Sequence, residues 1–141
     1  MTQYLLDTNA CIALINARPP IVRERFKQAE KAGDSFAVSS LVVFELRYGA
    51  AKSRSPDSSN AQVDVFLAGA LELLTFDELD AAQAGVLRAD LERRGTPIGA
   101  YEVLIAAQAV RRSCTVVTAN VSEFDRVTGL SSQDWSASPE I

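Results

Sequence analysis

Short apolar runs alternate along the chain with longer segments in which apolar and polar residues are mixed. The apolar runs, which we interpret as strands, lie at residues 5–6, 35–38, 73–76 and 115–118. Continuous apolar runs of this length are typical of strands that are buried on both faces of a parallel sheet. Because longer segments separate them, the pattern predicts an α/β fold with a short, mainly parallel central sheet.

The segments between the apolar runs carry start and stop signals for helices. Thr8 or Asn9 can cap a first helix that runs through Ile15, and Asp77 can cap a long helix that ends near Gly95. Further helices are predicted at about 20–32, 40–52, 61–71 and 100–112. The serine-rich stretch 53–60 is interpreted as a loop.

The length of 141 residues indicates one domain, which we place at residues 1–135, with a disordered tail at 136–141. No apolar run approaches the roughly 20 residues that a membrane span needs, and the N-terminus does not resemble a signal peptide. The two cysteines, Cys11 and Cys114, lie far apart in the sequence and are expected to be reduced. These features predict a cytoplasmic protein without membrane contacts.

The charge and the residue content exclude several classes of function. The net charge of −4 argues against binding nucleic acid through overall charge, although a local basic patch remains open. The sequence contains no histidine. A Ser-His-Asp triad, a Cys-His pair and a histidine-ligated zinc site are therefore excluded.

Three carboxylates occupy apolar surroundings. Asp7 follows the first apolar run, Glu45 lies within the apolar segment 41–46, and Glu102 begins the apolar segment 102–107. Buried carboxylates are costly unless they are paired or bind a metal. Because ligands bind beyond the carboxyl ends of parallel strands, Asp7 and the segment 118–120 converge if the first and fourth strands are neighbours. Oxygen ligands of this kind suit Mg²⁺ or Mn²⁺.

Each acid also has a structural interpretation. Asp7 can cap a helix, and Glu102 can interact with the dipole of its own helix, where Gly99 keeps the backbone uncluttered. Glu45 can pair with Arg47 or Lys52. The basic residues that follow the acids or end helices could hold a phosphate backbone or form solvated faces; they are Arg47, Lys52, Arg54, Arg93, Arg94, Arg111 and Arg112.

Several motifs in order along the chain resemble one known family. They are Leu5-Leu6-Asp7-Thr8-Asn9, Ser40-Leu41-Val42-Val43-Phe44-Glu45-Leu46-Arg47-Tyr48-Gly49, Pro97-Ile98-Gly99 followed by an acid and Leu104-Ile105-Ala106-Ala107, Val117-Thr118-Ala119-Asn120 with Glu123-Phe124, and Asp134-Trp135. Together they resemble the PIN-domain ribonuclease toxins of VapC type. The match spans nearly the whole chain, and the combination is specific although each piece alone is weak.

The resemblance implies a PIN-like three-layer α/β/α fold and a Mg²⁺- or Mn²⁺-dependent endoribonuclease. By this analogy Asp7, Glu45 and Glu102 are catalytic residues and metal ligands. Family members often have a fourth acid where this chain has Asn120, so Glu123 becomes the catalytic candidate that completes the site. Residues expected to contact the substrate are Thr8, Asn9, Arg47 and Asn120.

The same resemblance implies particular partners. The substrate would be RNA, and toxins with this N-terminal motif are associated with the anticodon stem-loop of initiator tRNA. The protein would be the toxin of a bacterial toxin–antitoxin pair, would form a homodimer and would be silenced by a VapB-like antitoxin. The C-terminal arm of such an antitoxin commonly places an arginine among the acids.

One position departs from the family, which usually has Asp where this chain has Glu102. The side chain is longer by one methylene, about 1.5 Å. We hypothesise that the metal site persists with reduced activity. Two other functions stay open. One is a PIN-like binding module with a degraded metal site. The other is a phosphatase of the haloacid-dehalogenase type, whose chemistry needs a second acid where this chain has Asn9.

Overall fold

A five-stranded sheet forms the centre of the computed structural model, in which residues 1–137 are described. The strand order is β3-β2-β1-β4-β5, and every pair is parallel. The strands are β1 (Gln3–Leu6), β2 (Ser35–Ser39), β3 (Glu72–Leu74), β4 (Thr115–Val117) and β5 (Ser131–Gln133). The predicted parallel α/β class is confirmed.

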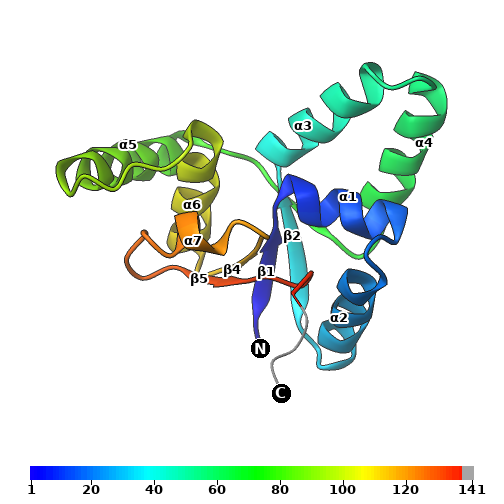
Figure 1. Ribbon diagram of the computed structural model, residues 1–141, viewed down its shortest axis with the longest axis horizontal. Helices are drawn as coiled ribbons and strands as arrows, with labels where there is room; N and C mark the ends of the chain where they lie inside the picture. Colours follow the sequence, from blue (N-terminus) through cyan, green and yellow to red (C-terminus); the bar gives the residue numbers. More distant parts are fainter. Residues whose placement is uncertain (138–141) are drawn as a thin grey trace.

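Helices lie on both sides of this sheet, which gives three layers (Figure 1). One group packs together beside β1 and β2 and consists of α1 (Thr8–Asn16), α2 (Pro20–Lys31), α3 (Ser40–Ala51) and α4 (Pro56–Leu67). The second group lies on the other side and consists of α5 (Glu78–Arg93), α6 (Ala100–Arg112) and the single-turn α7 (Val121–Phe124). The two groups flank the carboxyl ends of the central strands.

The apolar runs of the sequence form the core of the sheet. Leu5, Leu6, Val38 and Val116 are fully buried because helices cover both faces of the strands. Burying one such side chain contributes roughly 1.5–3 kcal/mol to stability. The core therefore holds the strand ends, and the polar residues that follow them, in fixed positions.

The central strands β1 and β4 are neighbours, as the predicted convergence of Asp7 with the segment 118–120 requires. Leu6 pairs with Val117, and the backbone N–H of Asp7 donates to the carbonyl of Val117 at 3.1 Å. Asp7 and Thr118 therefore follow directly after paired residues at the same edge of the sheet.

Three local predictions need correction. The side chain of Asp7, and not of Thr8 or Asn9, caps α1 by accepting from the Ala10 N–H. The helix α4 begins at Pro56, inside the stretch predicted as a loop, because proline is well suited to the first turn of a helix. Neither α7 nor β5 was predicted, since both are short and β5 is a polar edge strand.

The predicted C-terminal tail at 136–141 is only partly described. Ser136 donates its backbone N–H to the Asp134 carboxylate at 2.9 Å, and Arg25 donates to the Ala137 carbonyl at 3.2 Å. Residues 138–141 of the predicted tail lie outside the described residues.

Two further predictions concern cysteines and membranes. Cys11 and Cys114 are both buried and free, so they form no disulfide with each other. Within residues 1–137, no helix has the length and apolar character that crossing a membrane requires.

Candidate active site

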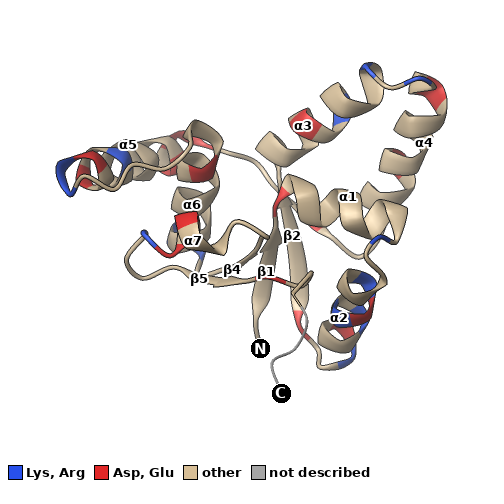
Figure 2. Cartoon of the chain, in the orientation of Figure 1, with Lys and Arg blue, Asp and Glu red and all other residues tan. Residues whose placement is uncertain are grey.

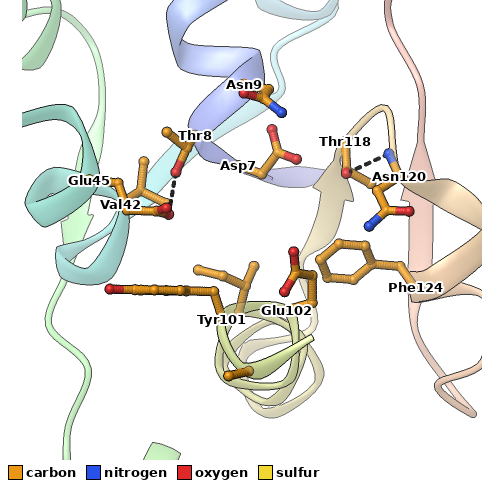
Figure 3. A pocket seen from close by; sticks show the side chains of 12 residues that line it. Asp7, Thr8, Asn9, Val42, Glu45, Tyr101, Glu102, Thr118, Asn120 and Phe124 are labelled. Atoms are coloured by element: carbon orange, nitrogen blue, oxygen red, sulfur yellow. Dashed lines mark hydrogen bonds between the residues drawn. The ribbon is translucent and has the colours of Figure 1, made fainter. Parts of the chain in front are cut away.

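A pocket of about 310 Å³ opens at the carboxyl ends of β1 and β4, between α1, α3 and α6. Figure 3 shows Asp7 between Glu45 on one side and Asn120 on the other, with Glu102 facing it from α6. The residues that line the pocket are Asp7, Thr8, Asn9, Val42, Glu45, Ala100, Tyr101, Glu102, Ile105, Thr118, Asn120 and Phe124. Segments far apart in the sequence thus contribute to one concave site.

Asp7 is held in place from several directions. Its Oδ1 accepts from the Ala10 N–H at 2.8 Å, while its own backbone N–H is bound to β4. Burial raises the pKa of the Asp7 carboxyl above its ordinary value of 3.8, and the charges of Glu45 and Glu102 raise it further. Hydrogen bonds from Ala10 and Thr118 offset part of this increase. Hydrogen bonds therefore fix the position of the Asp7 carboxyl, while burial and the neighbouring acids disfavour its charged form.

Glu45 reaches the pocket from the middle of α3. Its helix neighbours Val42 and Leu46 are buried, so the half-buried Glu45 side chain is on the inner part of the helix surface. The hydroxyl of Thr8 donates to Glu45 Oε1 at 2.6 Å. This hydrogen bond joins α3 to the start of α1 and keeps the Glu45 carboxylate near Asp7.

Glu102 lies in the first turn of α6, three residues after Gly99, which caps this helix. Its carboxylate folds back over Gly99, so that a Cβ added to Gly99 would lie 2.9 Å from Glu102 Cδ and closer still to Oε2. The extra methylene of Glu102 is therefore accommodated above a residue without a side chain.

Glu123 and Asn120 form a second polar group beside the pocket. Asn120 Nδ2 and the backbone N–H of Gly99 both donate to the Glu123 carboxylate in short hydrogen bonds. The bond from Asn120 lowers the pKa of the Glu123 carboxyl, and the bond from Gly99 lowers it further. Asn120 lines the pocket, whereas Glu123 is not among the lining residues and is linked to it through the Asn120 side chain.

The pocket concentrates negative charge without a cation. Among the described residues that line it, Asp7, Glu45 and Glu102 are acidic and none is a lysine or arginine. Carboxylate oxygens in this number suit a hard divalent ion, so the donor chemistry fits Mg²⁺ or Mn²⁺. The oxygens do not form a ready-made cage, because in residues 1–137 no three potential metal-binding side chains lie close enough together.

The basic residues expected to hold phosphate lie mostly elsewhere. Arg47 does not line the pocket; it contacts the Asp64 carboxylate at 2.7 Å and Asn60 Oδ1 at 3.1 Å, which joins α3 to α4. Arg111 and Arg112 face Asp77 and Asp80 at the α5–α6 contact. In Figure 2 several basic segments lie at the α3–α4 connection, on α2 and at the far end of α5, and others lie on α3 and after α7.

Sequence reasoning missed the aromatic residues at the pocket. Phe44 and Tyr101 are exposed, and their rings are nearly parallel, with centroids 6.3 Å apart and an interplanar angle of 12°. Tyr101 and Phe124 line the pocket. A signal was present in the sequence, because Phe44 directly precedes Glu45 and Tyr101 directly precedes Glu102.

Comparison with known proteins gives a family match over most of the chain. The PIN domain model matches residues 4–130. The tRNA(fMet)-specific endonuclease VapC of Salmonella typhimurium is 41% identical over 135 residues, which cover 96% of this chain and 99% of that protein. Ribonuclease VapC2 of Rickettsia felis is 36% identical over 94% of this chain and 97% of its own length.

Solved structures give the same result. The chain matches VapBC2 from Rickettsia felis bound to a promoter DNA fragment with a TM-score of 0.86 and 34% identity, covering 95% of this chain and 99% of that one. It matches DNA-bound VapBC from Salmonella typhimurium with a TM-score of 0.85 and 41% identity, covering 96% and 99%. The chain therefore belongs to the PIN domain family, among the ribonucleases of VapC type.

Proposed function

We propose that this protein is a divalent-metal-dependent endoribonuclease and the toxin of a VapBC-type pair. The observation that carries the proposal is a pocket in which three acids from three separate elements face one another without a lysine or arginine in its described lining. A structural acid cluster would be expected to contain compensating cations. An uncompensated cluster at the carboxyl ends of parallel strands suits a bound cation and a charged substrate.

The roles of the acids follow from their positions. Asp7, Glu45 and Glu102 are the residues that would hold Mg²⁺ or Mn²⁺. When bound, such an ion activates water and neutralises the charge that develops on a phosphodiester. Asp7 provides the fixed carboxylate, because its backbone and side chain are both hydrogen-bonded. The hydroxyl of Thr8 orients Glu45.

Polar residues around the acids suit contacts with the RNA backbone. The side chains of Thr8, Asn9 and Asn120 line the pocket and can donate or accept hydrogen bonds with phosphate and ribose. Glu123 accepts hydrogen bonds from Asn120 and Gly99, so we propose that it orients these two residues at the edge of the reaction site. We assign no substrate contact to Arg47, since its guanidinium is engaged with α4.

The substrate that we propose is initiator tRNA, cut in its anticodon stem-loop. Support comes from the Salmonella typhimurium and Shigella flexneri relatives, both named tRNA(fMet)-specific endonuclease VapC, which are 41% and 39% identical to this chain. These relatives match 96% of the chain, so the match includes every segment that lines the pocket.

We propose a VapB-like antitoxin and a second copy of the chain as protein partners, acting in the cytoplasm. The matched structures from Rickettsia felis and Salmonella typhimurium are VapBC complexes. Large apolar side chains are exposed on the outer helices, including Phe44, Tyr48, Leu79 and Val86. Phe44 and Tyr48 are one turn apart on α3, and Leu79 and Val86 are two turns apart on α5, so each pair can form part of an apolar patch that a protein partner covers. Light scattering of the purified chain should give twice the chain mass.

A cleavage assay tests the proposed activity. Purified protein is incubated with initiator tRNA and with an elongator tRNA, in Mg²⁺, in Mn²⁺ and in EDTA. We expect cleavage of initiator tRNA that needs the added ion and is absent in Asp7→Asn, a variant that retains a side-chain oxygen to cap α1. Cleavage that persists equally in EDTA or in Asp7→Asn would refute the metal-dependent mechanism.

A further inference from the structure

Two acids from different elements meet at Gly99. The backbone N–H of Gly99 donates to the Glu123 carboxylate from α7. The Glu102 carboxylate from α6 lies where a Cβ on the same glycine would be. Gly99 also caps α6, and its carbonyl accepts from the Val103 N–H at 3.0 Å. One residue thus contacts both acids on this side of the pocket.

The backbone of Gly99 does not explain why glycine is present. Its φ of −60° and ψ of 156° are extended values that any residue adopts. The requirement is steric, because a Cβ at this position would overlap the Glu102 carboxylate. The overlapping atoms belong to the end of a flexible side chain, so a Cβ would displace the carboxylate and leave the fold in place.

We propose that Gly99 is a positioning residue whose missing side chain sets the place of the Glu102 carboxylate in the pocket. The empty space above Gly99 is what lets this chain use a glutamate, one methylene longer than aspartate, at position 102. The proposal deepens the proposed function, on which it rests, by naming a residue that acts through a metal ligand.

The proposal predicts that the effect of Gly99→Ala on metal binding depends on the residue at position 102. In Gly99→Ala, the Glu102 carboxylate moves off the glycine, and approach to Asp7 is opposed by the charge repulsion between these two acids. In the metal-free protein it therefore turns toward solvent, and metal binding has to draw it back into the pocket. In the Glu102→Asp background the shorter side chain avoids the added Cβ, so Gly99→Ala has little effect on metal binding.

The experiment measures Mn²⁺ affinity by calorimetry in the full-length protein and in Gly99→Ala, Glu102→Asp and the double variant. We expect Gly99→Ala to weaken Mn²⁺ binding by about 10-fold or more, the size typical for residues that support a ligand. In the Glu102→Asp background we expect a loss of less than about threefold. Gly85→Ala is the matched control, since a Cβ there would contact nothing within 4 Å.

A second readout needs no metal. The ¹³C resonance of the Glu102 side-chain carboxyl in metal-free protein should shift in Gly99→Ala and remain unchanged in Gly85→Ala. Alanine is also a poorer helix cap than glycine, so a small fall in melting temperature is expected in both backgrounds and does not depend on residue 102.

The outcomes separate this proposal from the proposed function. An unchanged resonance in Gly99→Ala, or an equal loss of Mn²⁺ affinity in both backgrounds, would overturn the positioning role while leaving a metal-dependent nuclease intact. If the unmodified protein bound no Mn²⁺ and cut no RNA, the proposed function would fail, and the resonance would still decide whether Gly99 positions Glu102.

Discussion

Two groups of acidic side chains in this molecule differ in what surrounds them. At the contact of α5 and α6, Asp80 is fully buried and its Oδ1 lies 2.8 Å from Arg111 Nη1. Its Oδ2 accepts from the Asp77 N–H at 3.0 Å and from Gln108 at 3.3 Å. In the pocket, Asp7 lies near Glu45 and Glu102, and the described lining contains no lysine or arginine.

The carboxyl pKa values of Asp77 and Asp7, one in each region, are shifted in opposite directions. The Asp80 N–H lowers the pKa of the Asp77 carboxyl, and the nearby charge of Arg111 lowers it further. Burial and the two neighbouring glutamates raise the pKa of Asp7. The charged form of Asp77 thus stabilises the fold, whereas the charged form of Asp7 opposes it. Groups that oppose folding are often retained where they serve a function, which supports our proposal that the pocket is the reaction site.

The largest expected effect on stability is that of Asp80→Ala. Removing one member of a buried pair leaves its partners unsatisfied and costs about 3 kcal/mol. Urea denaturation should show this loss, while RNA cleavage per folded molecule stays unchanged. Asp90→Ala is the control, because its exposed pair with Arg94 contributes at most about 0.5 kcal/mol. A loss below about 1 kcal/mol in Asp80→Ala would mean that the α5–α6 acids are not structural.

Metal addition should stabilise the protein through the pocket alone. Mn²⁺ at about 100 times its Kd should raise the free energy of unfolding by about 2.7 kcal/mol, since it binds the folded state. The increase should persist in Asp90→Ala and disappear in Asp7→Asn. The same increase in Asp7→Asn would place the ion somewhere other than the pocket.

Replacing Glu102 by the shorter aspartate should raise the rate of RNA cleavage. Glu102→Asp restores the residue usual in the resembled family, and we expect RNA cleavage to rise on the order of tenfold, about 1.4 kcal/mol in transition-state energy. Single-turnover cleavage of initiator tRNA gives the rate. Equal rates for the two proteins would show that the longer side chain does not weaken the site.

The smallest effects concern pH, and the two regions should show opposite signs. The Asp7 pKa is raised, so its contribution to stability is present below its ordinary value of 3.8 and is lost as pH rises through the raised pKa. Asp7→Asn should therefore stabilise the metal-free protein at neutral pH, and the gain should vanish in acid. Melting temperatures measured across this pH range provide the test.

Asp77 gives the reverse dependence. Its pKa is lowered, so its contribution is present above 3.8 and is lost as pH falls through the lowered pKa. Asp77→Asn keeps an oxygen to cap α5 and should lower the melting temperature at neutral pH, with the difference fading in acid. The same pH dependence in Asp7→Asn and Asp77→Asn would remove the distinction between the two regions.

The acids of the pocket could be predicted from the sequence, whereas the buried acid at the α5–α6 contact could not. Asp7 stands at the end of an apolar run, so its convergence with the segment 118–120 could be expected from a parallel sheet in which the first and fourth strands are neighbours. Asp80 was not singled out, because it lies in a helix among other charged residues and its burial depends on the packing of α5 against α6.

The arginines show where sequence reasoning fails. Arg47 follows Glu45 by two residues, yet side chains two residues apart on a helix point in different directions, and Arg47 contacts Asp64 on α4. Arg111 was considered either as a phosphate contact or as part of a solvated face, but it pairs with the buried Asp80. A cation's partner depends on tertiary packing, which neither composition nor spacing specifies. The Gly99–Glu102 contact is also invisible in the sequence, since it depends on a side-chain rotamer.

The most direct test of the contrast is calorimetric titration of Mn²⁺ into the metal-free protein, into Asp7→Asn and into Asp90→Ala. We predict saturable binding by the unmodified protein and by Asp90→Ala, and none by Asp7→Asn. Absence of saturable binding by the unmodified protein, or unchanged binding by Asp7→Asn, would contradict the conclusion that the uncompensated acids form a metal site.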